Sequence, residues 1–202
     1  MLTLYTNPMS RGRIARWMLE EIGQPYDTVV LDYGTSMKAP AYMAVNPMGK
    51  VPGLVHDGQV ITEGGAICTY LAETFPEAGL MPAARGAFYR WMFFGAGPLE
   101  QAAVNGAMGW VPAPDRKRTV GYGSMDDVLT TLSGHLATHR YFCGDQFTAA
   151  DVYVGSQIGW GLGFKTLPVT PELLAYWDRI KTRPALARAN ALDDAVMKGE
   201  WR

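Results

Sequence analysis

Two short segments of this 202-residue chain carry groups suited to holding an extended, peptide-like ligand. The first, NPMGKVPGL at 46–54, has Pro52 just before an apolar stretch, where a proline cannot donate to a strand ladder. If the Val51–Pro52 bond is cis, Val51 turns its N–H and C=O outward, and both can pair with a ligand backbone. The second, TEGGAI at 62–67, places Glu63 directly before a predicted helix whose first N–H groups favour an anion. Together the two segments provide for one ligand amine and one ligand carboxylate.

The elements that must position these segments form a first domain of the α/β class, predicted over residues 1–78. Apolar periodicity and turn residues predict its elements in chain order: a strand at 2–6, a helix at 11–22, a strand at 27–31, a hairpin at 54–61 and a helix at about 65–74. Strand, helix and strand in succession imply a right-handed parallel crossover. The hairpin turns at Asp57-Gly58, which is a typical tight-turn dipeptide.

A turn-rich connector at 75–82 separates this domain from a second one, predicted to be all helical over residues 84–202. Helices are predicted at 84–108, 117–140, 149–160, 171–182 and 184–195. Pro98 should kink the first of them. Thr148 and Asp151 have the spacing of a capping pair, which gives this acid a structural role.

The motifs and their order resemble the cytosolic glutathione S-transferase family, of the bacterial type. The N-terminal run 2–13 with 17–26 is similar to the family's first strand, catalytic turn and first helix, while FTAAD at 147–151 and YWDR at 176–179, with RPA at 183–185, are similar to its helical-domain signatures. The resemblance covers nearly the whole chain. It implies a thioredoxin-like domain followed by an α-helical bundle, with glutathione as co-substrate and no metal.

The thiol of glutathione ionises near pH 8.5 when unperturbed, so an enzyme that uses it must favour the thiolate. Ser10 precedes the first helix, and its hydroxyl could donate to the sulfur with help from the helix dipole. A serine here is also a common N-cap that bonds only the backbone. Family members place the activating residue at slightly different points of this turn, so Tyr5, Thr6 and Asn7 stay rival candidates. Tyr5 is alternatively a core aromatic of a central strand.

The resemblance also assigns the residues that would bind the rest of glutathione. Val51, Pro52 and Glu63 are expected to hold the backbone and the γ-glutamyl end. The family usually has serine after the acid, whereas this chain has Gly64, whose backbone N–H still binds but whose side chain offers no donor. The missing hydrogen bond to a charged group is worth about 1.5–3 kcal/mol at most. Lys38 is the candidate for the glycyl carboxylate, with Lys50 as the alternative.

The function implied by the resemblance is conjugation, in which the glutathione thiolate attacks a hydrophobic electrophile and the second domain supplies an apolar pocket. A second possibility uses the same thiolate to reduce peroxides or disulfides. The third is a non-catalytic binding or assembly module, which the departure at Gly64 keeps open.

The composition of the chain limits the kinds of partner that it is expected to bind. With 18 basic and 19 acidic residues the net charge is −1, which argues against nucleic acid. Cys68 and Cys143 have neither disulfide-framework nor zinc spacing. No signal-peptide pattern and no membrane-length apolar run is found, so we expect a cytoplasmic protein without a membrane partner.

A homodimer is expected from the first predicted helix of the second domain. It concentrates aromatic and apolar residues, namely Tyr89, Trp91, Met92, Phe93 and Phe94. A monomer that exposed all of them would show more contiguous apolar surface than soluble monomers usually do. Relatives place the substrate cleft near a two-fold interface, which would bury such a patch.

Overall fold

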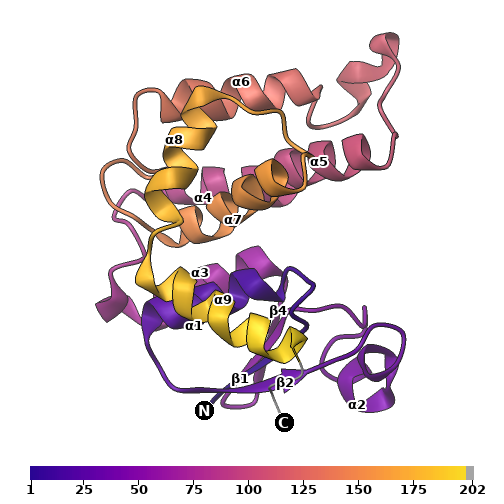
Figure 1. Ribbon diagram of the computed structural model, residues 1–202, viewed down its shortest axis with the longest axis vertical. Coiled ribbons are helices and arrows are strands. Elements are labelled where there is room, and N and C mark those ends of the chain that lie inside the picture. The colour runs from indigo at the N-terminus through magenta and orange to yellow at the C-terminus, as the bar shows by residue number, and fades with distance from the viewer. Residues whose placement is uncertain (199–202) are drawn as a thin grey trace. The chain divides into compact units, whose positions relative to one another are not determined.

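The computed structural model describes residues 1–198 of the chain (Figure 1). These residues divide into two compact units. The first comprises Met1–Leu80 together with the chain from Thr182 onward, and the second is Met81–Lys181.

A four-stranded mixed sheet forms the first unit's centre. Its strands are β1 (Leu2–Thr6), β2 (Tyr26–Val30), β3 (Gly53–His56) and β4 (Gln59–Thr62), in the spatial order β2-β1-β3-β4. β1 pairs parallel with β2, whereas β3 is antiparallel to both β1 and β4. The predicted crossover and hairpin are therefore both found. Asp57 and Gly58 both have positive φ, as a tight hairpin turn requires.

The helices of the first unit include the two predicted at 11–22 and about 65–74, and one that was predicted in the second domain. They are α1 (Gly12–Ile22), the single turn α2 (Pro40–Met43), α3 (Gly64–Thr74) and α9 (Pro184–Met197), with 3-10 turns at Ser36–Lys38 and Pro76–Ala78. α1 buries Ile14, Trp17 and Met18 completely and packs against both α3 and α9. It ends at Gly23, whose φ of 69° lets its N–H donate to the Leu19 carbonyl.

The range predicted for the second domain, 84–202, needs correction at its C-terminal end, because α9 belongs to the first unit. Figure 1 shows α9 running beside α1. Its buried residues include Leu186, Ala189 and Asp193. Apolar periodicity reveals that a helix has a face to bury but not the surface that will cover it, so the return of α9 to α1 could not be predicted from the sequence.

The second unit is all helical, as predicted. Its helices are α4 (Arg85–Phe94), α5 (Glu100–Ala107), α6 (Met125–Leu136), α7 (Ala149–Gly163) and α8 (Pro171–Ile180). A π-helical turn (Gly95–Leu99) containing Pro98 joins α4 to α5. Since proline lacks an N–H and its ring crowds the preceding turn, the wider π turn accommodates it. α7 contacts α4 and α8 and is buried on nearly every side.

The predicted helix at 117–140 is wrong at its start. A 3-10 turn (Pro114–Thr119) comes first, and α6 begins only at Met125. Gly123 has φ of 69°, which interrupts helical geometry. Ser124 then caps α6, with its Oγ accepting from the Asp127 N–H at 3.2 Å.

The capping pair predicted at the start of α7 is confirmed. The Thr148 N–H donates to Asp151 Oδ2 at 2.9 Å, and the Thr148 hydroxyl donates to the same oxygen. Oδ1 accepts from the Phe142 N–H at 3.0 Å and from the Tyr176 hydroxyl at 2.9 Å. Burial raises the pKa of Asp151 to about 6, against the opposing effect of these donors.

Candidate functional site

Strand register brings three distant segments of the first unit to one end of the sheet. At that end Tyr5 of β1 lies opposite Gly53 of β3, and Gly53 lies opposite Thr62 of β4. Three segments therefore adjoin the same end of the sheet: the turn after β1, the segment before β3, and the start of α3 after β4. These are the segments that carry Ser10, Val51 and Glu63.

The Val51–Pro52 peptide bond is cis, which is the condition under which Val51 was expected to turn its backbone groups toward a ligand. The peptide just before it is held in place by two side chains: the Tyr42 hydroxyl donates to the Lys50 carbonyl at 2.6 Å, and the Asn46 amide donates to the same oxygen at 2.8 Å. Burial raises the pKa of Tyr42, so its hydroxyl stays a donor at neutral pH. The two hydrogen bonds thus fix the position of the peptide that leads into Val51.

Gly53 leaves room for the Tyr42 hydroxyl to reach the Lys50 carbonyl. A Cβ at Gly53 would lie 2.9 Å from the Tyr42 hydroxyl oxygen, so any larger residue would push Tyr42 away. The ring of Tyr42 packs in turn against Tyr5, with their centroids 5.3 Å apart. The buried Tyr42 therefore contacts both the segment that leads to Val51 and the end of β1.

Glu63 stands at the N-cap of α3 with an unusual backbone conformation, φ 69° and ψ 123°. L residues rarely adopt such a positive φ, and they persist there where the surrounding structure requires it. Its side chain is exposed, and no hydrogen bond or ion pair within residues 1–198 reaches its carboxylate. Gly64 begins α3, so its N–H is among those that a helix leaves for an outside acceptor.

The turn after β1 is held by internal hydrogen bonds. The Ser10 hydroxyl donates to the Asn7 carbonyl at 2.6 Å and accepts from the Gly12 N–H at 2.9 Å. The Asn7 amide donates to the Leu31 carbonyl at 2.7 Å, and its Oδ1 accepts from the Met9 N–H at 2.8 Å. Ser10 is only half-buried, so a ligand atom can still approach its oxygen.

The rival candidates for the thiol-activating residue differ in how accessible their side chains are to a ligand. Thr6 is fully buried, and its Oγ1 is packed so closely beneath the first turn of α1 that a Cβ at Gly12 would overlap it. Both polar atoms of the Asn7 side chain are occupied. Tyr5 is half-buried against Tyr42.

Lys38 lies beside the loop that leads to Val51. Its ammonium donates to the Met48 carbonyl at 2.9 Å. Gly49 makes this approach possible, because its φ is 55° and a Cβ there would lie 2.8 Å from the Lys38 Nζ. Lys50 is exposed and contributes its carbonyl to the contacts described above.

This arrangement coincides with clear similarity to known proteins. The family model of the glutathione S-transferase N-terminal domain matches residues 1–73, and that of the C-terminal domain matches residues 101–160. The chain belongs to the glutathione S-transferase family. Glutathione S-transferase 3 of Zea mays is 30% identical over 94% of this chain and 93% of its own length.

Solved structures of glutathione transferases agree with the assignment. That of Methylococcus capsulatus superposes with a TM-score of 0.79 at 29% identity, covering 96% of this chain and 99% of its own. A sphingomonad glutathione S-transferase complexed with glutathione gives 0.77 at 28% identity, covering 95% and 98%.

Neither cysteine of this glutathione S-transferase family member is prepared for thiolate chemistry. Both are free thiols. Complete burial raises the pKa of Cys68, and burial raises that of Cys143 to about 11. Within residues 1–198 no group of three or more His, Cys, Asp or Glu side chains is placed to hold a metal ion, and no described helix is long and apolar enough to cross a membrane.

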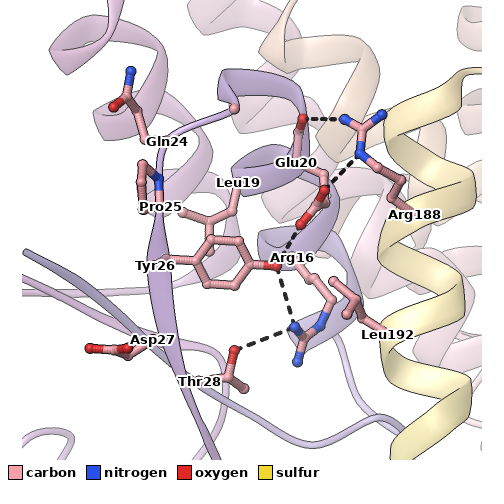
Figure 2. A pocket seen from close by; sticks show the side chains of 11 residues that line it. Arg16, Leu19, Glu20, Gln24, Pro25, Tyr26, Asp27, Thr28, Arg188 and Leu192 are labelled. Atoms are coloured by element: carbon pink, nitrogen blue, oxygen red, sulfur yellow. Dashed lines mark hydrogen bonds and ion pairs between the residues drawn. The ribbon is translucent and has the colours of Figure 1, made fainter.

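A cavity of about 850 Å³ lies elsewhere in the first unit, among α1, β2 and α9 (Figure 2). None of the candidate glutathione residues lines it. Its polar groups bond one another: the Tyr26 hydroxyl donates to Glu20 at 2.8 Å, and Arg188 also pairs with Glu20 at 2.9 Å. Arg16 reaches Tyr26 and Thr28 from below. We assign this network to the packing of α9 on α1.

Sequence reasoning missed the residues that support the site rather than line it. Tyr42 and Asn46 fix the Lys50 carbonyl, and Arg13 bonds the turn after β1. Asn46 lies in the Asn-Pro segment that the sequence analysis singled out. Its hydrogen bond to the Lys50 carbonyl, four residues later, could be recognised only once the conformation of the loop was known. No sequence pattern pointed to Tyr42.

Proposed function

We propose that this chain binds glutathione at the end of its sheet and transfers the glutathione sulfur to an electrophilic carbon of a hydrophobic co-substrate. The observation that carries the proposal is the convergence of Val51, Glu63 and the Ser10 turn in a member of this family, with the Glu63 carboxylate unpaired within residues 1–198. An exposed acid in a rarely adopted backbone conformation is costly to keep unless a ligand uses it.

In the proposed complex the ligand backbone pairs with Val51. The Glu63 carboxylate accepts from the γ-glutamyl ammonium group, and the Gly64 N–H donates to the neighbouring carboxylate at the positive end of α3. Lys38 is the proposed partner of the glycyl carboxylate, because its ammonium already lies at the loop beside Val51.

The thiol is proposed to meet the Ser10 hydroxyl. Because that hydroxyl donates to the Asn7 carbonyl in the free protein, activation requires it to rotate its proton toward the sulfur while still accepting from Gly12. Tyr5 remains the alternative donor. The thiolate then attacks the electrophile, its leaving group departs with the bonding electrons, and the thiol proton passes to solvent.

A turnover assay with glutathione and a generic aryl halide tests the proposal. We expect thioether formation that saturates in both substrates and is lost when glutathione is replaced by its S-methyl derivative, which has no thiol. Glutathione binding without turnover of aryl halides, and without reduction of a peroxide or a disulfide, would instead favour the non-catalytic module.

We also propose a homodimer formed through α4. The structure corrects the patch expected from the sequence, because Trp91 and Met92 are buried within the second unit. Phe93 remains 73% exposed and Tyr89 is also exposed, so a smaller apolar surface is available for a partner. Light scattering should give about twice 22.1 kDa, and Phe93→Glu should give 22.1 kDa.

A further inference from the structure

The helix α9 is fixed to α1 by pairs of arginine and carboxylate side chains. Four such pairs join the two helices or the residues that flank them, namely Arg13–Asp194, Arg16–Asp193, Arg183–Glu21 and Arg188–Glu20. The second pair is buried, with its two side chains 2% and 1% exposed and its Nε–Oδ1 distance 2.9 Å. A buried pair of this kind specifies one register between two helices, since removing either partner leaves an uncompensated charge.

Arg13 differs from the other three arginines because it also contacts the turn after β1. Its Nε donates to the Pro8 carbonyl at 2.6 Å. The other end of the same guanidinium donates to Asp194 Oδ1 at 2.7 Å and to Asn190 Oδ1 at 3.3 Å, both on α9. A planar guanidinium has its donors in a fixed fork, so one side chain holds both partners in a set geometry.

The contacted turn is the one that carries the candidate activating residue. Pro8 stands between Asn7, whose carbonyl accepts from Ser10, and Met9, whose carbonyl accepts from the Tyr33 hydroxyl at 3.0 Å. The turn is thus bonded toward β2 through Asn7 and Tyr33, and toward α9 through Arg13.

We propose that Arg13 is a positioning residue, through which the C-terminal helix α9 sets the turn that presents Ser10 to the thiol. The inference rests on the proposed function, since it assigns the turn a part in thiol activation. It makes α9, some 180 residues away in sequence, part of the support of the reaction centre. Within residues 1–198 the Arg13 side chain bonds Pro8 and residues of α9 and none of the residues proposed to bind the two ends of glutathione, so its loss should lower turnover rather than glutathione affinity.

Arg13→Ala is compared with Arg188→Gln, a matched control that also removes an arginine pair between α9 and α1 but has no contact with the turn. We expect Arg13→Ala to lower kcat about tenfold while the KM for glutathione stays within about twofold. Arg188→Gln should leave both constants unchanged. Arg13→Lys keeps the charge but lacks the fork, so it should restore only part of kcat.

Asp194→Ala tests the connection to α9 itself. If Arg13 acts through α9, Asp194→Ala should lower kcat in the same direction, and the double variant with Arg13→Ala should be no slower than Arg13→Ala alone. Additive losses in the double variant would contradict the coupling. Equal kcat in Arg13→Ala and Arg188→Gln would overturn the positioning role, whereas an inactive wild-type protein would be a failure of the proposed function.

Hydrogen exchange gives a readout that needs no activity. The N–H groups of Met9, Ser10 and Gly12 are all bonded within the turn. In Arg13→Ala, a peptide covering residues 7–12 should exchange faster than in the wild type, and in Arg188→Gln it should not. Unchanged exchange of this peptide in Arg13→Ala would refute the inference whether or not the protein turns over.

Discussion

Two acidic residues at the starts of helices, Glu63 before α3 and Asp151 in the first turn of α7, look alike in sequence and have opposite surroundings. Four donors converge on Asp151, and its side chain is buried. The Glu63 side chain is exposed, its carboxylate receives no hydrogen bond from residues 1–198, and its backbone has a positive φ. A helix N-terminus favours either acid, so the dipole alone does not separate a structural carboxylate from one that awaits a ligand. The hydrogen-bond donors around each carboxylate distinguish the two roles.

The largest effect should follow removal of the enclosed acid. Asp151→Ala leaves two buried N–H groups and two hydroxyls without their acceptor, and each orphaned donor costs about 1–3 kcal/mol. We expect a loss of about 3–5 kcal/mol in the free energy of unfolding. Denaturant titration measures it. If Asp151→Ala also abolished glutathione binding in the folded protein, the separation of the two roles would be wrong.

The pH dependence of stability should come next in size. The folded pKa of Asp151, about 6, exceeds the value of 3.8 expected in the unfolded chain. Between these values the folded state therefore binds more protons, so stability from this group is full below about pH 4 and is lost as pH rises through about 6. The wild type should lose about 3 kcal/mol relative to Asp151→Asn between pH 4 and pH 7. Parallel stability curves for the two proteins would exclude this shift.

For Glu63 we expect the effect to fall on the ligand instead. Glu63→Gln keeps the shape but removes the charge, and a hydrogen bond between charged groups contributes about 1.5–3 kcal/mol. Glutathione affinity should therefore fall about 10- to 150-fold by calorimetry, while the melting temperature without ligand stays unchanged. A lowered melting temperature would show that the carboxylate has a structural partner.

Much of this contrast could be predicted from the sequence. The spacing of Thr148 and Asp151 identified the capping pair, and the Val51–Pro52 segment was singled out as a place where a cis bond would serve a ligand, because both are local patterns with few solutions. The placement of α9 and the contact of Arg13 with Pro8 were missed, since they depend on which surfaces meet over long sequence distances. Gly123, which delays α6, was overlooked as a helix breaker.

Ser10 lies between the two cases, since its hydroxyl is bonded internally and yet is half-exposed. In Ser10→Ala the pKa that governs turnover should rise by about one unit, equivalent to about 1.4 kcal/mol, as the thiolate loses its donor. The cap lost with Gly12 should cost about 1 kcal/mol of stability. A pH–rate profile measures the first effect. A stability loss with an unchanged profile would leave Ser10 a cap only, and a shifted profile in Tyr5→Phe would transfer the role to Tyr5.

The smallest effect concerns the backbone of Glu63. Alanine and glycine both remove the carboxylate, but only glycine adopts a positive φ without steric cost. Glu63→Gly should therefore be about 1 kcal/mol more stable than Glu63→Ala, with equally weak glutathione binding. Equal stability of the two variants would mean that the backbone at position 63 relaxes.

The most direct test of the account is a calorimetric cycle with two proteins and two ligands. Wild type and Glu63→Gln are each titrated with glutathione and with an analogue that lacks the γ-glutamyl amino group. The wild type should bind the analogue about 10- to 150-fold more weakly than glutathione, because the Glu63 carboxylate loses its ammonium partner. Glu63→Gln should bind both ligands about equally. Discrimination that is as strong in Glu63→Gln as in the wild type would contradict the assignment of Glu63 to the glutathione site.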